Sequence, residues 1–391
     1  MRITARPWLV RSLGRALRRA RVVLVFAAAI AAACKPDQGN FSQDPGFTAY
    51  FATRPRGSDP PSEADKRLLA AHAPRILLPA GHPGLIGFYP DYIAQGMLTD
   101  GAGRVISTAV DREILNAHKA DPLAIFVHRP RAAPQHPIVF ARIDREPGPS
   151  GAPWTFLTYN AVFRHSGVPA GMPRWQDWAL GLIADLEDWH QLDHYTAATI
   201  AFDEAGHPVA LILQQHNDLR TYLFGRDVPW PDDGRVVLDV AMRSNELYPH
   251  EPGPVRHRAV AMPSAAGMRY LVTGRGRPLF AADDITDSVD EAAYRLGFLP
   301  HDDAFYAFQG WLGERRLLPG RDGPPGADFN TWPHDKGKLR EMLAGYWREG
   351  DERYLAALAK RATSGDAMAV DLEGALIADL RCLASGPAAT C

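Results

Sequence analysis

The segment DWHQLDHY, residues 188–195, concentrates side chains that could do chemistry. It holds two aspartates and two histidines within eight residues. Carboxylates and imidazoles serve as metal ligands and as general acids or bases. His190 and His194 are four residues apart, which suits a ligand pair on one helix, but the β-like run that begins at Thr196 indicates that a helix ends between them. The segment is therefore either a metal or catalytic centre, or a polar connection between a helix end and a core strand.

The elements around this segment predict a mainly β fold. Pro173–His190 has its apolar residues on one helical face, which predicts an inserted amphipathic helix. Strand-length runs rich in β-branched and aromatic residues recur between Gly, Pro and Asp turns, and TIAFDEAGHPVALIL predicts a hairpin. We expect an antiparallel, jelly-roll-like β-sandwich over residues 63–320 and a helical C-terminal extension over residues 321–391. The β-like runs are 123–129, 137–144, 154–163, 196–203, 208–216, 221–225, 235–242 and 269–274.

The N-terminus has the pattern of an export signal. Seven arginines precede the first acidic residue, and the apolar run Val22–Ala33 is too short to cross a bilayer. The sequence AAAC that ends at Cys34 resembles the lipobox of bacterial lipoproteins, which implies cleavage before Cys34 and acylation of its sulfur. We then expect a signal peptide over residues 1–33, a flexible tether over residues 34–62, and anchoring to the lipid bilayer. Lys35, where an Asp would imply retention in the inner membrane, favours the outer membrane. A secretory signal without lipidation is the alternative.

Composition narrows the class of partner. The 391 residues carry 43 basic and 45 acidic side chains, and this balance gives no indication of a nucleic-acid partner. Besides Cys34, the only cysteines are Cys382 and Cys391. An even pair in an exported chain predicts a Cys382–Cys391 disulfide that closes a small terminal loop. The sequence contains neither a G-x-S-x-G nucleophile motif nor a P-loop.

The order of several strand motifs resembles a known group of β-sandwiches. APRILLPAGHPG, WTFLTYNAVF, TAATIAFDEAGHPVALILQQHN, RVVLDVAMRSNELYP and FYAFQGWLG follow one another as related segments do in the fungal vacuolar-protein-sorting-associated family and its plant relatives of unknown function. The necrosis-inducing protein toxins are more remotely similar. The resemblance covers about residues 70–313 and implies a β-sandwich.

The resemblance also implies where a metal site would lie. The acidic motif of the family falls on residues 194–196, where His194 and Thr196 replace both carboxylates, and a further acidic position falls on His82. Only His216 stands where the family has histidine. His82, His194 and His216 are thus candidate ligands for a divalent transition metal, with Asp193 orienting one imidazole. In the alternative, the site has been abandoned and these histidines make hydrogen bonds within the fold.

Three functions remain open from the sequence. The first is a non-catalytic binding or structural lipoprotein of the envelope, with an envelope protein, glycan or lipid as ligand. The second is a metal-dependent hydrolase of an envelope or extracellular substrate. The third is a toxin-like protein that binds membranes or glycans. The polar loop SNELYPHEPG is a candidate ligand rim, with Asn245, Glu246 and Tyr248 at its edge.

Overall fold

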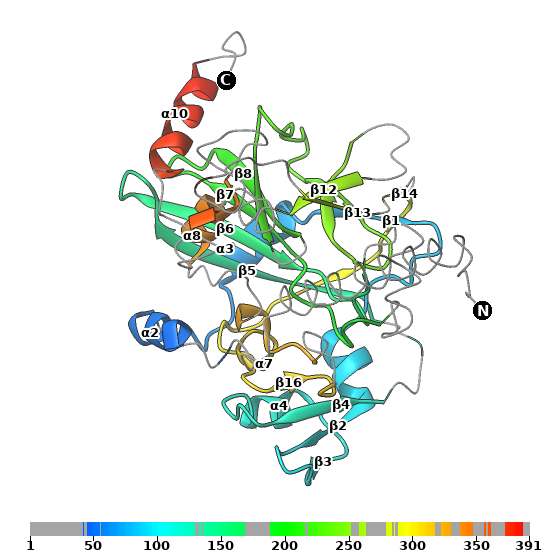
Figure 1. Cartoon of the computed structure of the whole chain (residues 1–391). Helices are drawn as coiled ribbons and strands as arrows, with labels where there is room; N and C mark the ends of the chain where they lie inside the picture. Colours follow the sequence, from blue (N-terminus) through cyan, green and yellow to red (C-terminus); the bar gives the residue numbers. More distant parts are fainter. Residues whose placement is uncertain are drawn as a thin grey trace, which may run out of the picture.

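The computed structural model has three β-sheets of four or more strands and a separate two-stranded sheet among its described residues, with helices around them (Figure 1). The structure describes residues 45–54, 56–129, 136–168, 188–215, 218–251, 258–262, 279–283, 288–316, 322–329, 337–346 and 372–385, together with a few isolated positions. The signal-peptide region, Cys34, most of the expected inserted helix and residues 269–274 lie outside them.

The largest sheet has six strands in the order β15-β5-β6-β7-β8-β9. The strands β5 to β9 form an antiparallel meander, and only β15 pairs in parallel, with β5. The expected hairpin is present between β7 and β8, where Asp203 accepts hydrogen bonds from the backbone N–H groups of Ala205 and His207 and Gly206 adopts a left-handed conformation. The strands are β5 (Ile138–Pro147), β6 (Pro153–Asn160), β7 (Ala197–Phe202), β8 (Pro208–Gln215), β9 (Asp218–Leu223) and β15 (Arg295–Gly297).

A four-stranded sheet packs against the inner face of this sheet. Its order is β11-β10-β1-β14, and β1 runs parallel to β10. Leu157, Ile200 and Leu213 of the large sheet share one buried apolar cluster with Ile76 and Leu238 of the small one. The fold is therefore mainly β with a sandwich core, as the sequence predicts, although the second sheet is mixed rather than antiparallel. Its strands are β1 (Arg75–Pro79), β10 (Val237–Val240), β11 (Leu247–Pro249) and β14 (Ser288–Glu291), and α3 (Glu63–Ala71) adds Leu69 to the cluster.

A third sheet, in the order β16-β4-β2-β3, forms the lower part of the molecule in Figure 1. It closes a second apolar core that includes Phe88, Phe126 and Phe305. The elements of this part are η2 (Phe88–Tyr92, a π-helix), η3 (Ile93–Gln95, a 3₁₀-helix), β2 (Gly96–Thr99), β3 (Val105–Ser107), α4 (Arg112–Ala117), β4 (Ile125–His128), α7 (Ala304–Ala307), β16 (Trp311–Leu312) and η4 (Ala327–Phe329, a 3₁₀-helix). Strands β12 (Arg258–Met262) and β13 (Leu279–Asp283) form a separate antiparallel pair.

The C-terminal extension is helical where it is described, and it covers part of the outer face of the large sheet. Helix α8 (Lys338–Gly345) packs on β9, and Met342 and Leu343 share a third apolar cluster with Phe156 and Ile212. Helix α10 (Leu372–Ala384) adds Leu372 and Leu376 to the same cluster. Within this extension, DERYLAALAKRA (residues 351–362) was also expected to be helical, and it lies largely outside the described residues.

Two expectations about the N-terminal half need correction. Residues 34–62 were expected to be a flexible tether, but α2 (Pro45–Thr53) lies within that range. The reason is an aromatic contact, since Phe47 and Phe51 pack edge-on against Phe329. The inserted helix was expected to end at His190, but Trp189 and His190 instead donate backbone hydrogen bonds to the Ser166 carbonyl. Within the described residues, no helix has the length and apolarity needed to cross a membrane.

Candidate functional site

The outer face of the large sheet carries a buried polar stripe. Because side chains alternate along a strand, Arg142, Asp144 and Glu146 of β5 point away from the apolar core that Ala141 and Ile143 enter. Thr158 and Asn160 of β6, Thr199 of β7 and Gln214 of β8 extend the stripe across the sheet. All four are at most 5% exposed. Buried polar residues on one strand face signal a built site more strongly than polar residues at the surface do.

A cavity of about 420 Å³ lies over this stripe. That volume is in the range of sites for small molecules. The sheet forms its floor. Its walls are Phe47, Tyr50 and Phe51 of α2 with Arg54 and Arg56 just after it, Asp328 of η4 with His301, and Lys338 and Glu341 of α8. Figure 1 shows α2 at the side of the molecule, apart from the sheets.

Asp328 joins two arginines at the centre of the cavity. Its carboxylate accepts from Arg142 Nη1 at 2.5 Å and from Arg56 Nε at 3.2 Å. Burial alone would raise the pKa of Asp328, but Arg142 and Arg56 outweigh burial and hold that pKa below its usual value. The Arg56 guanidinium also lies 3.3 Å from the centre of the Phe51 ring, so this arginine fastens α2 to the cavity by a cation–π contact.

Glu146, another residue of the cavity lining, connects β5 to Arg54 and to α8. Its carboxylate pairs with Arg54 Nη1 at 3.3 Å and accepts from the backbone N–H of Leu339 at 3.1 Å, in the first turn of α8. Gly337, just before that helix, has φ 104°, and a side chain added there would come within 3.0 Å of the Glu146 carboxylate. Burial raises the pKa of Tyr50 to about 12, with Glu146 and Asp144 adding to the effect, so its hydroxyl keeps its proton at neutral pH.

Several buried polar atoms at the cavity lack a hydrogen bond to any described residue. They include Arg56 Nη2, a donor, and Asn160 Oδ1, an acceptor. Arg142 Nε and Asp144 Oδ2 face each other at 3.5 Å, too far for a good hydrogen bond. A buried polar group without a partner costs about 1–3 kcal/mol, so these atoms lower the stability of the fold around the cavity.

His82, a candidate metal ligand, has both ring nitrogens in hydrogen bonds. The Gly84 N–H donates to Nδ1 at 3.0 Å, so Nε2 carries the hydrogen and donates to Asn245 Oδ1 at 3.1 Å. Burial lowers the pKa of His82 to about 4, which keeps the ring neutral at physiological pH. Neither nitrogen has a free lone pair in this tautomer, so His82 could bind a metal only after losing these contacts.

Asp193, which was expected to orient one of the imidazoles, lies in the same hydrogen-bonded network. It accepts from Asn245 Nδ2 at 2.9 Å and from Thr196 Oγ1 at 2.7 Å. Burial raises the pKa of Asp193 to about 6, although these hydrogen bonds oppose the rise. Asn245, which joins Asp193 to His82, has φ 58°, an uncommon conformation that the network holds in place.

His194 lies in a different environment from His82. Its fully buried ring stacks on Phe88 at 6.0 Å and meets Phe305 edge-on at 5.4 Å, in the second apolar core. Neither ring nitrogen has hydrogen-bond geometry to a described residue. Burial lowers the pKa of His194 to about 3, and the backbone at Pro325 offsets only part of this effect.

The described residues thus do not form the expected three-histidine centre. Among the described residues, no three His, Cys, Asp or Glu side chains are grouped so as to hold a metal. His216 lies outside the described residues, so the full ligand set stays a prediction. Cys34 and Cys391 also lie outside them. Cys382 is disulfide-bonded, and its pairing with Cys391 stays a prediction.

The expected ligand rim is buried. Asn245, Glu246 and Tyr248 are at most 7% exposed. Tyr248 donates to the buried Asp283 at 2.5 Å, and Asn245 is held in the network described above. The loop was expected at the surface because it is polar, but Ser244, Asn245 and Tyr248 make hydrogen bonds inside the fold. Only His250 and Glu251, further along the described part of the loop, are exposed.

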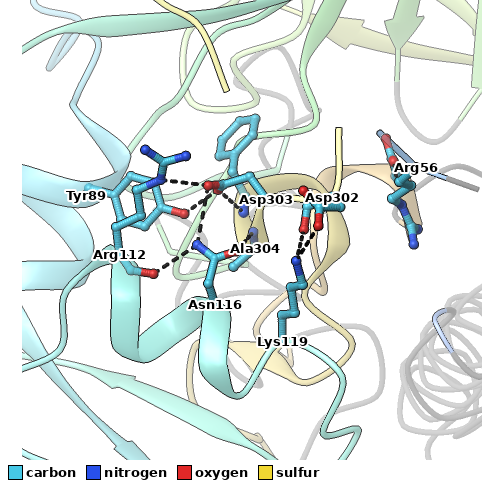
Figure 2. Close-up of polar contacts among 10 residues, drawn as sticks. Arg56, Tyr89, Arg112, Asn116, Lys119, Asp302, Asp303 and Ala304 are labelled. Atoms are coloured by element: carbon cyan, nitrogen blue, oxygen red, sulfur yellow. Dashed lines mark hydrogen bonds and ion pairs between the residues drawn. The ribbon is translucent and has the colours of Figure 1, made fainter. Parts of the chain in front are cut away.

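A further carboxylate, Asp303, organises the third sheet region (Figure 2). Arg112 donates to it at 2.8 Å and Asn116 at 3.3 Å, and the Tyr89 hydroxyl also donates to it. It caps α7 by accepting from the Phe305 N–H at 3.0 Å. Its acceptor oxygens are occupied, and it lies outside the cavity lining, so its role is to join η2, α4 and α7.

Comparisons with known proteins give only distant likenesses. No family model matches the chain, and no curated protein matches it. The solved structure named "NLPPya in complex with glucosamine" is similar over 50% of this chain and 70% of its own, with 14% identity and a TM-score of 0.27. A structure named "Toxin fold for microbial attack and plant defense" is similar over 50% and 72%, with 12% identity and a TM-score of 0.26. The likeness of the sequence to the fungal and plant family has no support from these matches, and scores this low do not bear on what the chain binds.

Proposed function

We propose that this chain is an exported, lipid-anchored protein of the cell envelope that binds a small polar molecule in the cavity on its large sheet. The observation that carries the binding role is the cavity of about 420 Å³ itself, whose floor is a stripe of buried polar side chains on the large sheet. The arginine-rich start, the short apolar run and the AAAC sequence at Cys34 support the anchor, and Lys35 supports an outer-membrane location.

A binding role fits the state of the charged groups. Each carboxylate of the cavity is engaged by a lining arginine or lysine, as in Lys338–Glu341 at 2.7 Å and Arg54–Glu146 at 3.3 Å. Such pairs fix the shape of a site and orient its donors. Arg142 and Arg56 hold the pKa of Asp328 below its usual value and so keep it charged, whereas a general acid or base needs a pKa tuned to give and take a proton.

Filling the cavity is expected to abolish binding. Ala197 of β7 lines the cavity floor, and Ala197→Phe places a ring in the space without removing any polar partner. A set of sugars, polyols, amino acids and short envelope glycans is screened by thermal unfolding. A ligand at about a hundred times its Kd adds about 2.7 kcal/mol, which raises the Tm by a few degrees.

The matched control is Ala205→Phe in the exposed β7–β8 turn, which should keep the full shift. Circular dichroism checks that both variants fold. A shift that persists in Ala197→Phe, or the absence of a shift with every compound, would refute binding in this cavity.

Cys34→Ala is expected to release the protein from the membrane fraction, because the thioether-linked lipid would be its stable attachment. Cell fractionation with an immunoblot measures this, and Cys382→Ala serves as the control that removes a cysteine elsewhere. Unchanged membrane fractionation of Cys34→Ala would overturn the anchor.

A further inference from the structure

We propose that the end of the third sheet at the β2–β3 turn contacts the lipid bilayer beside the anchor. This inference rests on the proposed attachment through Cys34 and adds a second contact between the protein and the membrane. The partner is a lipid surface, and Val105 and Leu123 make the contact.

Two exposed apolar side chains lie together at this end of the sheet. Among the described residues, the exposed large apolar side chains are Val105 and Leu123, at 55% and 62%. Leu123 lies against the β2–β3 turn, since a Cβ added at Gly101 would come within 3.0 Å of the Leu123 Cβ. Val105 begins β3, directly after the same turn. Single exposed apolar residues are ordinary on a protein surface, but two that flank one turn form a small apolar surface.

The polar groups around this apolar surface are compatible with a lipid interface. Asp100 accepts hydrogen bonds from the backbone N–H groups of Ala102 and Arg104, and Asp121 accepts from the N–H of Leu123. Both carboxylates therefore have partners within the turns. The Arg104 side chain is 85% exposed and pairs with Asp100 at 2.7 Å. Its long stem can lie on apolar surface while the guanidinium stays among the headgroups.

The chain that leads to the anchor meets the folded body beside this sheet. Ser42, eight residues after Cys34, is 6% exposed and donates from Oγ to the Gln309 carbonyl at 2.7 Å. The backbone N–H groups of Gln309 and of the first residue of β16 donate to carbonyls within residues 119–124. The segment that holds Ser42 therefore runs along the part of the chain that contains Leu123.

Val105 is also within reach of this point. Trp311, Ile125, Thr99 and Val105 stand opposite one another in one row across β16, β4, β2 and β3. Neighbouring strands are about 4.8 Å apart, so Val105 lies about 14 Å from Trp311. A flexible chain of eight residues spans about 16 Å on average and at most about 28 Å. An anchor at Cys34 would thus keep this end of the sheet close to the bilayer.

The chain offers a matched pair of positions for a test. The β2–β3 turn reads DGAGR and the β7–β8 turn reads DEAGH, and each aspartate accepts from the N–H groups two and four residues later. Ala102 and Ala205 are the exposed alanines of these turns. Phe140, near the start of β5, joins the second apolar core beside the third sheet, whereas the β7–β8 turn lies at the other end of the large sheet.

The test measures which of the two turns meets lipid. Ala102→Cys and Ala205→Cys are made in the full lipid-bearing chain and labelled with the fluorophore NBD. Each is reconstituted into vesicles of phosphatidylethanolamine and phosphatidylglycerol, part of which carries a nitroxide quencher near the headgroup. An apolar face at an interface enters about 5–10 Å into the headgroup boundary, so quenching at residue 102 should be at least about two-fold stronger than at residue 205. Cys382 is disulfide-bonded, so it does not take the label.

Val105→Glu combined with Leu123→Glu gives a second readout. Both side chains are exposed, so the fold should be kept, and circular dichroism checks this. The variant should stay on the vesicles through its lipid but lose the stronger quenching at residue 102. Quenching that survives both substitutions would overturn the inference, because the two apolar side chains would not make the contact.

The outcomes separate this contact from the anchor. Equal quenching at the two turns, in a chain that floats with the vesicles in a density gradient, would overturn the contact and leave the anchor standing. A chain that does not float with the vesicles would overturn the anchor, and with it the contact that rests on it.

Discussion

The free energy of unfolding is expected to fall by about 5 kcal/mol between pH 8 and pH 5, because three partly or fully buried histidines are held neutral in the fold. Burial lowers the pKa of His82 and of His128 to about 4 and that of His194 to about 3. In the unfolded chain each regains its ordinary pKa of 6.5. Below pH 6.5 the unfolded chain therefore binds more protons than the folded one, and stability falls as the pH falls.

The size of the effect follows from the same linkage. At pH 5 each of these histidines contributes a loss of about 2 kcal/mol. Asp193 has the opposite effect on the free energy of unfolding. Its pKa in the fold, about 6, lies above the usual 3.8, so the folded chain binds this proton more readily and is stabilised as the pH falls. That gain is about 1 kcal/mol over this range. Since domains are stable by about 5–15 kcal/mol, the loss brings the protein close to acid unfolding.

Urea unfolding followed by tryptophan fluorescence at pH 5, 6, 7 and 8 measures this dependence. His194→Phe keeps a ring against Phe88. The change that this substitution makes to the free energy of unfolding should be about 2 kcal/mol more favourable at pH 5 than at pH 8. The comparison within one variant removes the packing contribution. His207→Phe, at a histidine whose side chain is 76% exposed, is the control and should show no such difference. Equal stability of the unmodified protein at pH 5 and pH 8 would refute the prediction.

Asp303→Ala is expected to lower the free energy of unfolding by about 3–5 kcal/mol. The Asp303 side chain is 1% exposed. Its carboxylate accepts hydrogen bonds from four groups on α4, η2 and α7 (Figure 2). Its removal leaves the Tyr89 hydroxyl and the Phe305 N–H without their acceptor, and each such group costs about 1–3 kcal/mol when buried. Arg112 is half exposed and can turn to solvent, which keeps the loss from being larger.

The neighbouring residue supplies a matched control. Asp302 also forms an ion pair, with Lys119 at 2.9 Å, but its side chain is 33% exposed. Asp302→Ala should therefore cost about 1 kcal/mol or less. Denaturant unfolding at pH 8 compares the two variants, and similar losses for both would show that Asp303 has no special structural role.

The strands of the large sheet could be predicted from the sequence because the pattern that indicates each strand lies within a few consecutive residues. Runs such as IVFARID and PVALILQQ combine β propensity with turn residues at both ends, and each became a strand close to its expected bounds. Which strands pair with one another was harder to predict from the sequence. β1 and β10 are more than 150 residues apart and pair in parallel, and no local pattern specifies such a long-range pairing.

The cavity was missed for a similar reason. A signal existed in the alternation of Arg142, Asp144 and Glu146 with apolar neighbours along β5, but this pattern is also typical of a strand with one solvated face. What turns the polar face into a site is its burial under α2 and α8, two segments that come from opposite ends of the chain. Conversely, the histidines that stood out by type are hydrogen-bonded within the network or packed among aromatic rings.

The sequence by itself determined the mainly β class, the β7–β8 hairpin and the expectation of an exported, lipid-anchored chain, because strand periodicity, turn residues and signal peptides are all encoded in short stretches. It left DWHQLDHY open between a metal centre and a polar connection. Only the tertiary structure could show that Asp193 is held by Asn245 and Thr196 while His194, its neighbour, faces an apolar core. Burial and partners decide what a polar side chain can do, and both come from residues distant in the sequence.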